Sequence, residues 1–394
     1  MKGTVVQRKL AITAAGLSLV AVCYGLARFA YGLFVPALRE EFHLDGATAG
    51  VIASASYAGY CVAIVVASLA TQRWGARPVA VAAGIAATAG TALIASAPTA
   101  ALLAVGVVVG GSSTGLASPP LADAVAKWVP AHRADRIQAV VNSGTGAGVL
   151  VSGPVALLAD DSWRAAWWAF AAIAAAVTVW IAFAVPGGPA AVTPGSRTRV
   201  LPPGAPRLLI AATALGVSSA AVWTFGRDVL VTEGGASALT STLVWIVLGA
   251  AGILGGLAGD LATKLGTGRA WTATMVALGA ATATLALAAD HVVVTVPAGA
   301  VFGASYIALT GLALLWATRV YAERPAFGVG AAFLLVAVGQ AAGAPLIGLL
   351  SDTYGPVTAF LVATAVALAG GLVRPARTSR PDAATTADPA PRPG

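Results

Sequence analysis

The sequence predicts an all-α membrane protein with twelve transmembrane helices, arranged as two pseudo-symmetric six-helix halves. Hydrophobic residues make up 58% of the 394 positions and charged residues only 10%, whereas about a quarter of the residues of a soluble domain are charged. The apolar residues form twelve stretches, and 19 of the 23 Lys and Arg residues fall in every second gap between these stretches. Together these observations exclude a soluble fold.

Each apolar stretch approaches the roughly 20 residues that a helix needs to cross the hydrocarbon of a bilayer. The first stretch follows Lys9 as a signal peptide would, but it is too long for one and has no convincing cleavage site. We therefore keep it as the first span. In chain order the predicted spans are 11–37, 48–70, 78–97, 99–121, 138–158, 164–185, 207–231, 239–258, 270–289, 291–315, 327–350 and 356–373.

The charged residues between spans predict the orientation of the chain. Cytoplasmic loops keep Lys and Arg, whereas translocated loops do not. We therefore expect a multi-pass protein of the inner, cytoplasmic membrane with both termini in the cytoplasm. The net charge of +8 is spread as a few residues per loop, so it indicates contact with the lipid bilayer and no nucleic-acid partner. We expect a monomer. The gaps on the opposite side are mostly acidic, with Glu40, Glu41, Asp45, Asp160, Asp161, Glu233, Asp290 and Asp352.

Two similar halves are expected on either side of a Pro- and Gly-rich segment. The predicted units are a first half at 1–185, a cytoplasmic linker at 186–206, a second half at 207–373 and a disordered cytoplasmic tail at 374–394. A parallel repeat of this kind is typical of one class of secondary transporters. A shift of 191 residues superposes, among others, Arg133 on Arg324, Gly148 on Gly339, Pro154 on Pro345 and Asp161 on Asp352.

The loop between the second and third spans carries a known family pattern. Residues 68–77 read SLATQRWGAR, which is similar to the G-x-L-a-D-r-x-G-r-r loop of the major facilitator superfamily, with Ser68 in place of Gly and Gln72 in place of Asp. The second half has a counterpart that retains the acid, from Gly256 to Asp260. The chain as a whole resembles a bacterial efflux permease of this superfamily. The resemblance implies gating roles for Gln72, Arg73, Gly75 and Asp260.

The fifth span is rich in small residues and ends in Gly153-Pro154. Its sequence from Asn142 to Gly148, NSGTGAG, resembles the motif found on this helix in the antiporters of the superfamily. The resemblance implies antiport and a gating role for Gly153 and Pro154. Small residues allow close helix packing and a Pro kink allows bending, so this span is either a flexing element or simply a closely packed one.

Three charged residues fall within predicted spans and not at a span end: Arg28, Arg227 and Asp228. A charge at the bilayer centre costs about 2.5–3.5 kcal/mol on insertion scales, so it usually faces a cavity or a partner. Tyr24 and Tyr31 stand four residues before and three residues after Arg28, which places all three side chains on one helix face. Arg28 is the best candidate for a substrate-binding residue. The alternative is a buried structural ion pair, for example with Asp228.

The seventh span places Trp223 and Arg227 on one face, while Asp228 points about 100° away. This group lies either in the central cavity or at the outer interface, since Glu233 follows closely. Asp228 is the one acidic side chain expected within a span, so it is the candidate proton carrier. An ion pair with Arg227 or Arg28 would instead keep it charged.

Uncharged polar and aromatic side chains complete the candidate site. Each of them binds substrate or packs between helices, because polar groups at membrane depth need a hydrogen-bond partner. No catalytic residues, metal site or cofactor are expected: His43, His132 and His291 lack ligand spacing, and no phosphate-binding loop is present. The uncharged candidates for the substrate-binding site are Tyr57, Tyr60, Asn142, Trp245, Tyr306 and Gln340.

These observations together predict a secondary active transporter and not an enzyme. The favoured function is export of a small organic molecule by proton antiport, with alternating access between the two halves. Arg28 and Arg227 against one acid favour a carboxylate-bearing or neutral substrate over a cation. One alternative is uptake or exchange of a small carboxylate without protons. A membrane-embedded sensor or enzyme on the same scaffold is a rival from a different class.

Overall fold

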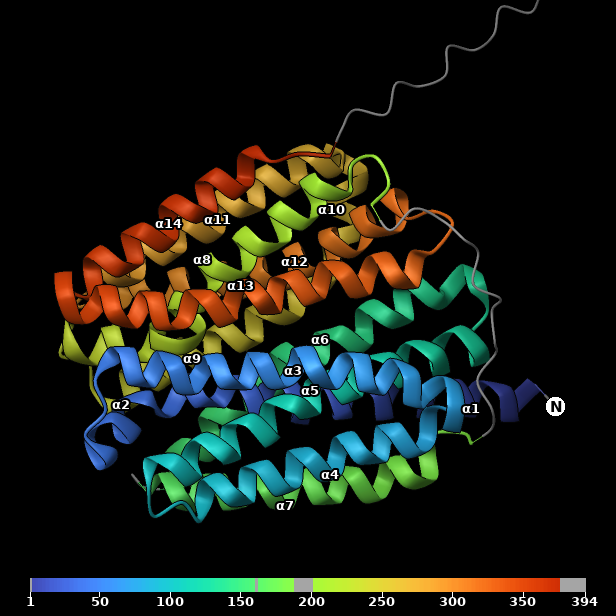
Figure 1. Ribbon diagram of the computed structural model, residues 1–394, viewed down its shortest axis with the longest axis horizontal. Coiled ribbons are helices and arrows are strands. Elements are labelled where there is room, and N and C mark those ends of the chain that lie inside the picture. Colours follow the sequence, from blue (N-terminus) through green and yellow to red (C-terminus); the bar gives the residue numbers. More distant parts are fainter. Residues whose placement is uncertain (1, 160–161, 188–200, 376–394) are drawn as a thin grey trace, which may run out of the picture.

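The computed structural model describes residues 2–159, 162–187 and 201–375, and in this part of the chain it contains helices and no strands (Figure 1). Eleven helices are long and apolar enough to cross a membrane, and a shorter apolar helix, Pro356–Leu372, completes the set. The predicted fold of twelve membrane helices is confirmed. Most of the predicted linker and tail lies outside the described residues.

The helices up to residue 184 form what we call the first half. Its first span is a continuous rod of three parts, α1 (Lys2–Val20), the π-helix η1 (Ala21–Phe29) and α2 (Ala30–Phe42). The remaining helices follow in order: α3 (Gly46–Trp74), α4 (Ala76–Ala95), α5 (Ala100–Trp128), α6 (Ala131–Leu158) and α7 (Trp163–Ala184).

The helices from residue 205 onward form the second half, and they lie on the opposite side of the molecule in Figure 1. The predicted span at 239–258 is interrupted by the short 3-10 helix η2 (Gly255–Leu257), and the chain continues as a separate α-helix from Ala258. The α-helices of this half are α8 (Ala205–Thr232), α9 (Ala238–Leu254), α10 (Ala258–Leu265), α11 (Thr267–Leu287), α12 (Val292–Val320), α13 (Pro325–Tyr354) and α14 (Pro356–Leu372).

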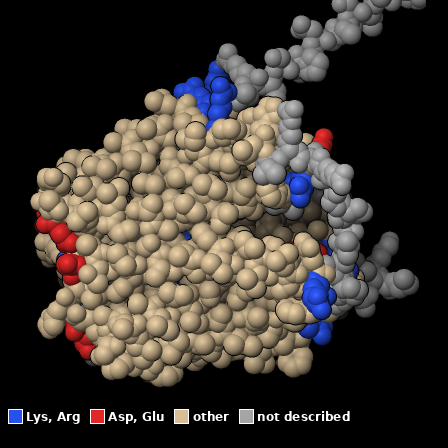
Figure 2. Space-filling model, in the orientation of Figure 1, with Lys and Arg blue, Asp and Glu red and all other residues tan. Residues whose placement is uncertain are grey.

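Charged side chains gather at the two ends of the helices, with Lys and Arg mostly at one end and Asp and Glu at the other (Figure 2). We call these the basic end and the acidic end. The described basic end includes Arg73, Arg77, Lys264 and Arg319; the described acidic end includes Glu40, Glu233, Asp290 and Asp352.

Glycines allow the two halves to pack closely. The main contacts between them are α3 with α13, α6 with α9 and α2 with α8. A Cβ atom on Gly148 of α6 would collide with the carbonyl oxygen of Ala21, and one on Gly146 of α6 would lie 2.7 Å from the carbonyl oxygen of Gly249 on α9. The small residues of the fifth span therefore serve close packing on two sides, against the first span and against the second half.

Candidate functional site

Arg28 lies near the middle of the first span, on the π-helix η1. A π-helix widens the helical turn, and such segments occur frequently at functional sites. Gly25 permits this segment to touch α6, because a Cβ there would collide with the backbone of Gly148. The Arg28 side chain is thereby held inside the bundle, where the residue is only 6% exposed.

The guanidinium of Arg28 is bound by neutral groups. Its Nη2 donates a hydrogen bond of 2.8 Å to Oε1 of Gln340 in the other half, and its Nη1 approaches Oγ1 of Thr114 at 3.5 Å. Its Nε is buried and has no hydrogen-bond partner in the described part of the chain. Within that part, no carboxylate lies within 4.0 Å of the guanidinium, and Asp228 pairs with Arg39 instead. An ion pair between Arg28 and Asp228 is therefore not present.

Four aromatic rings surround the same guanidinium. The distances from its central carbon to the ring centroids are 4.6 Å for Tyr57, 5.0 Å for Tyr60, 5.2 Å for Phe29 and 5.8 Å for Tyr24. These contacts offset part of the cost of burying the charge. They leave the full positive charge available, because aromatic rings carry no net charge.

Tyr31 does not belong to this group of rings. Its hydroxyl donates to the carbonyl oxygen of Ala49 at 3.0 Å, which fixes it as a packing contact between the first span and α3. The expected alignment with Arg28 assumed α-helical spacing, and the π-helical turns before Tyr31 change that spacing.

The second half supplies the other wall of the site. Nε2 of Gln340 is 3.3 Å from the hydroxyl of Tyr306 and 3.4 Å from that of Ser219. Tyr306 packs against Trp223 at 5.1 Å between centroids, and Trp223 stacks on Phe29 of the first half at 4.0 Å. The indole nitrogen of Trp223 is buried and has no partner among the described residues. The candidates Trp223, Tyr306 and Gln340 thus lie together beside Arg28.

Three residues of the site were not among the candidates: Phe29, Thr114 and Ser219. Phe29 immediately follows Arg28, so its position was a usable signal. Thr114 and Ser219 are small hydroxyl residues in Gly- and Ala-rich spans, where the sequence does not distinguish them from ordinary packing residues.

Asn142 lies elsewhere in the bundle, whereas Trp245 borders the site, because its ring packs edge-to-face on Trp223 at 5.9 Å between centroids. The side-chain oxygen of Asn142 accepts from Gln138 at 3.1 Å on the same helix. The indole of Trp245 donates to the Ser152 hydroxyl at 3.0 Å, which joins α9 to α6 across the two halves. Both side chains are engaged in helix contacts in this conformation.

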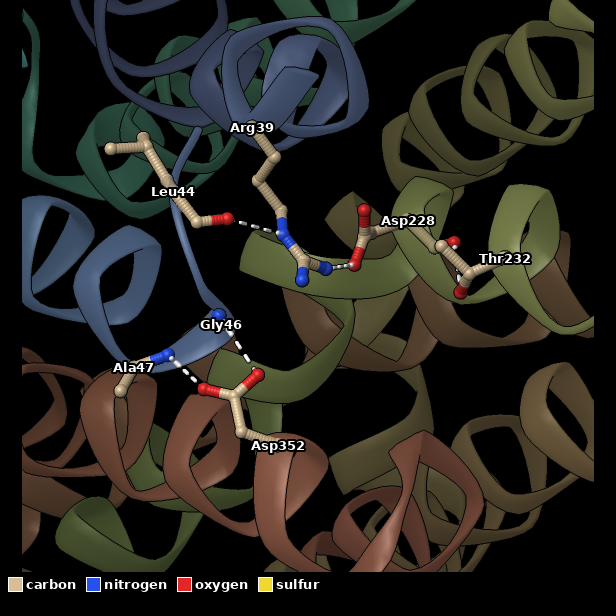
Figure 3. A network of polar contacts seen from close by, with 7 residues as sticks. All are labelled: Arg39, Leu44, Gly46, Ala47, Asp228, Thr232 and Asp352. Carbon is tan, nitrogen blue, oxygen red and sulfur yellow. Dashed lines mark hydrogen bonds and ion pairs between the residues drawn. The ribbon is translucent and has the colours of Figure 1, made fainter. Parts of the chain in front are cut away.

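Arg227 and Asp228 lie at the acidic end and not beside Arg28. Figure 3 shows Asp228 there, facing Arg39. Asp228 forms an ion pair of 2.5 Å with Arg39 of α2, and Arg39 also donates to the carbonyl of Leu44 at 3.3 Å. Arg227 donates to the carbonyl of Leu33 at 2.6 Å. The sequence left open a position in the central cavity or one near the end of the helix, and the structure places both residues near the helix end. A cavity of about 460 Å³ opens beside this group, lined in part by Arg39, Glu40, Arg227 and Asp228.

A second carboxylate joins the halves at the acidic end. Asp352 accepts hydrogen bonds from the backbone nitrogens of Gly46 at 2.9 Å and Ala47 at 2.7 Å (Figure 3). These nitrogens belong to the first turn of α3, where the helix dipole favours a negative charge. Asp45 caps the same turn, because its carboxylate accepts a hydrogen bond from the backbone nitrogen of Thr48. Hydrogen bonding with Thr48 lowers the pKa of the Asp45 carboxyl.

The predicted gating residues of the basic end make no polar contact with the other half within the described residues. Gln72, Arg73 and Asp260 are exposed. Gly75 ends α3 with a positive φ of 83°, a conformation that suits glycine.

The contacts across the halves are therefore unevenly distributed along the helices. Gly153 packs on Ile246 of α9, where a Cβ would collide with that side chain, and Pro154 follows it within α6. The polar contacts that join the halves lie at the acidic end or at mid-depth, as far as the described residues extend. Figure 2 shows the surface hollowed between the halves at the basic end. The structure is a conformation held together at its acidic end.

The fold and this buried central site define a polytopic membrane transporter with two helical halves. The chain belongs to the Major Facilitator Superfamily, whose family model matches residues 17–337. A search among proteins of curated function finds no match.

Solved structures of transporters share the fold. A mutant of the nucleoside transporter NupG superposes with a TM-score of 0.74 at 11% identity, covering 93% of this chain and 98% of that chain. A POT family transporter in complex with 5-aminolevulinic acid superposes with a TM-score of 0.73 at 14% identity, covering 93% of this chain and 94% of that chain. At these identities the likeness concerns the fold alone.

Proposed function

We propose that this protein transports small organic carboxylates and that Arg28 binds the carboxylate. The observation that carries the proposal is the buried guanidinium of Arg28, which has neutral partners and no counter-ion among the described residues. A buried charge without a partner is costly. A carboxylate is the natural partner, because it matches the planar donor geometry of a guanidinium and forms charge-assisted hydrogen bonds with it.

The surroundings of Arg28 favour a monocarboxylate with an apolar or aromatic body. Arg227 lies at the acidic end, so Arg28 is the one described cation at mid-depth. The rings of Tyr24, Tyr57 and Tyr60 offer flat apolar surface next to the guanidinium. Such a body would stack on these rings while its carboxylate replaces the amide oxygen of Gln340 on Arg28.

Export by proton antiport is the transport mode that we propose. In this mode the basic end faces the cytoplasm, as the positive-inside rule predicts, and substrate enters there. Protonation of Asp228 removes its attraction to Arg39, which frees the acidic end to open and release substrate. The cavity beside Asp228, which also contains Arg39, Arg227 and Glu40, gives water access to that carboxyl. Re-forming the ion pair requires Asp228 to release its proton. Antiport requires this proton to leave through the basic end, because its return through the acidic-end cavity would couple no proton movement to transport.

A specific observation favours exchange or uptake of carboxylates as the second candidate. Within the described residues no protonatable acid lies beside Arg28, and Asp228 is engaged with Arg39 at the acidic end. In this alternative the substrate carboxylate is the one charge that crosses the membrane, and its transport is not coupled to proton movement.

Transport into proteoliposomes separates these candidates. Probes are labelled small carboxylates, beginning with 4-hydroxybenzoate and lactate, each measured beside its primary amide and against protein-free liposomes. The proposal predicts flux of at least one carboxylate but not its amide, and loss of this flux in Arg28→Gln but not in Arg164→Gln, which alters an exposed ion pair. Antiport predicts stimulation by a pH gradient and its loss in Asp228→Asn. Gradient-independent carboxylate exchange would support the second candidate, and equal flux of acid and amide would contradict both.

A further inference from the structure

The membrane helix that begins at Ala238 is broken near the basic end. α9 ends at Leu254, η2 covers Gly255–Leu257, and α10 begins at Ala258. Gly255 packs directly on α12, where its Cβ would lie 2.5 Å from the Cβ of Ile307, whereas a Cβ on Gly256 would meet nothing within 4 Å. The break therefore presses one face of the helix against α12 and leaves the other face open.

A groove of about 330 Å³ lies beside this break, between α9, α10, α11 and α12. Leu254 and Leu257 are 62% and 59% exposed, so the groove opens on the outer surface of the bundle, where acyl chains lie in a membrane. Its volume is within the range of ligand pockets. The lining is mostly apolar and includes Leu254, Leu257, Leu261, Ala273, Ala277 and Ala308.

Two cations lie beyond the groove lining toward the basic end, on the two helices α10 and α11. Lys264 follows Leu261 by three residues on α10, and Arg269 precedes Ala273 by four residues on α11. These spacings place each cation on the helix face that lines the groove. Both are exposed, and neither has an ion-pair or hydrogen-bond partner among the described residues. Arg319 differs, because its guanidinium donates to the Thr267 hydroxyl at 2.5 Å.

We propose that this groove binds an anionic phospholipid, with an acyl chain along the apolar lining and the phosphate between Lys264 and Arg269. Anionic headgroups are attracted to basic side chains at the membrane surface, and an acyl chain matches the lining in polarity. Asp260, which is exposed one turn before Lys264, opposes this attraction. The two cations outweigh its single charge.

Native mass spectrometry of the purified protein tests the proposal, using equimolar phosphatidylglycerol and phosphatidylcholine as the probes. We expect one tightly retained phosphatidylglycerol, with a preference of at least about fivefold. The double variant Lys264→Gln/Arg269→Gln should lose this preference. The matched control Arg73→Gln/Arg324→Gln removes the same charge from the same end and should keep it. Asp260→Asn should strengthen the preference.

The groove itself is tested by filling it. Ala273→Phe should release the retained lipid, while Val276→Phe, an exposed position on α11 outside the lining, should not; melting temperatures verify that both variants fold. Equal loss of preference in the two double variants would show general surface attraction and overturn the proposal. Lipid retention in Ala273→Phe would also overturn it. The proposal would also be overturned if the parent protein is a dimer that Ala273→Phe dissociates while lipid retention stays the same. A second copy of the chain would then occupy the groove.

Discussion

Arg28 on η1 and Gln340 on α13 are joined by a hydrogen bond of 2.8 Å that crosses the boundary between the two halves. The amide oxygen of Gln340 accepts a hydrogen bond from the buried guanidinium of Arg28, which has no carboxylate among its described neighbours. A neutral oxygen satisfies the hydrogen bond but leaves the charge uncompensated. The pair therefore links occupation of the site to the contact between the halves, because a bound carboxylate would compete with Gln340 for Arg28.

Replacing this polar pair by apolar side chains should stabilise the protein and abolish function. In Arg28→Met/Gln340→Met no buried charge remains and neither partner is left alone, so we expect an increase of about 1–3 kcal/mol in the free energy of unfolding. The single variant Gln340→Met should be destabilised, since it removes the main hydrogen bond of Arg28. Thermal unfolding in detergent measures both. A double variant that is less stable than either single variant would contradict this account of the pair.

Loss of the Arg39–Asp228 ion pair should open the acidic end. Asp228→Asn keeps the shape of the side chain but removes its charge, so we expect a larger population with separated halves. Double electron–electron resonance between spin labels at Thr48→Cys and Thr353→Cys, in a background with Cys23→Ala and Cys61→Ala, measures this separation. Both label sites are exposed at the acidic ends of α3 and α13. Glu233→Gln, an exposed acid of the same end, is the control and should leave the distance unchanged.

Acidification should also increase the population with separated halves, measured with the same two spin labels. Protonated Asp228 loses its attraction to Arg39. The population with separated halves should therefore rise as the pH falls. Asp228→Asn should show a large separation at every pH and little further change. An unaltered pH response in that variant would mean that other groups control the acidic end.

Gly148 should tolerate no larger side chain, because its hydrogen atoms face the backbone of Ala21 in the first span. We expect Gly148→Val to lower the free energy of unfolding by at least about 3 kcal/mol, an overpacking cost at the upper end of the usual range. Gly256→Val is the matched control, since a Cβ at Gly256 would meet nothing within 4 Å. Melting temperatures of the two variants provide the comparison. Equal losses would show that valine is disfavoured for its helix propensity alone.

Much of the fold could be predicted from the sequence because hydropathy and charge act locally. The spans follow from their length and composition, and Arg28 stands out because an arginine within a span requires a reason. The break at Gly255–Leu257 could not be located, because glycine occurs throughout these spans and only packing against Ile307 distinguishes this one.

The parts that could not be predicted depend on contacts between distant residues. Arg39 lies just beyond the end of the first predicted span, where a basic residue needs no ion-pair partner, so nothing in the sequence indicated its pairing with Asp228, 189 residues further on. The orientation of Tyr31 was missed because a π-helix leaves no clear pattern in the sequence. Thr114 and Ser219 were missed because small hydroxyl residues in membrane helices usually bond to their own helix.

The most direct test of the central claim is the binding of carboxylates to Gln340→Glu, compared with the parent and with Gln340→Ala. The glutamate would supply a carboxylate to Arg28 at the position of the present amide oxygen. Isothermal titration with the transported carboxylate and its primary amide measures both affinities. We predict that the parent and Gln340→Ala prefer the acid over the amide by at least about tenfold, or about 1.4 kcal/mol, and that Gln340→Glu loses this preference. Full carboxylate binding by Gln340→Glu would contradict the assignment of Arg28 as the carboxylate-binding residue.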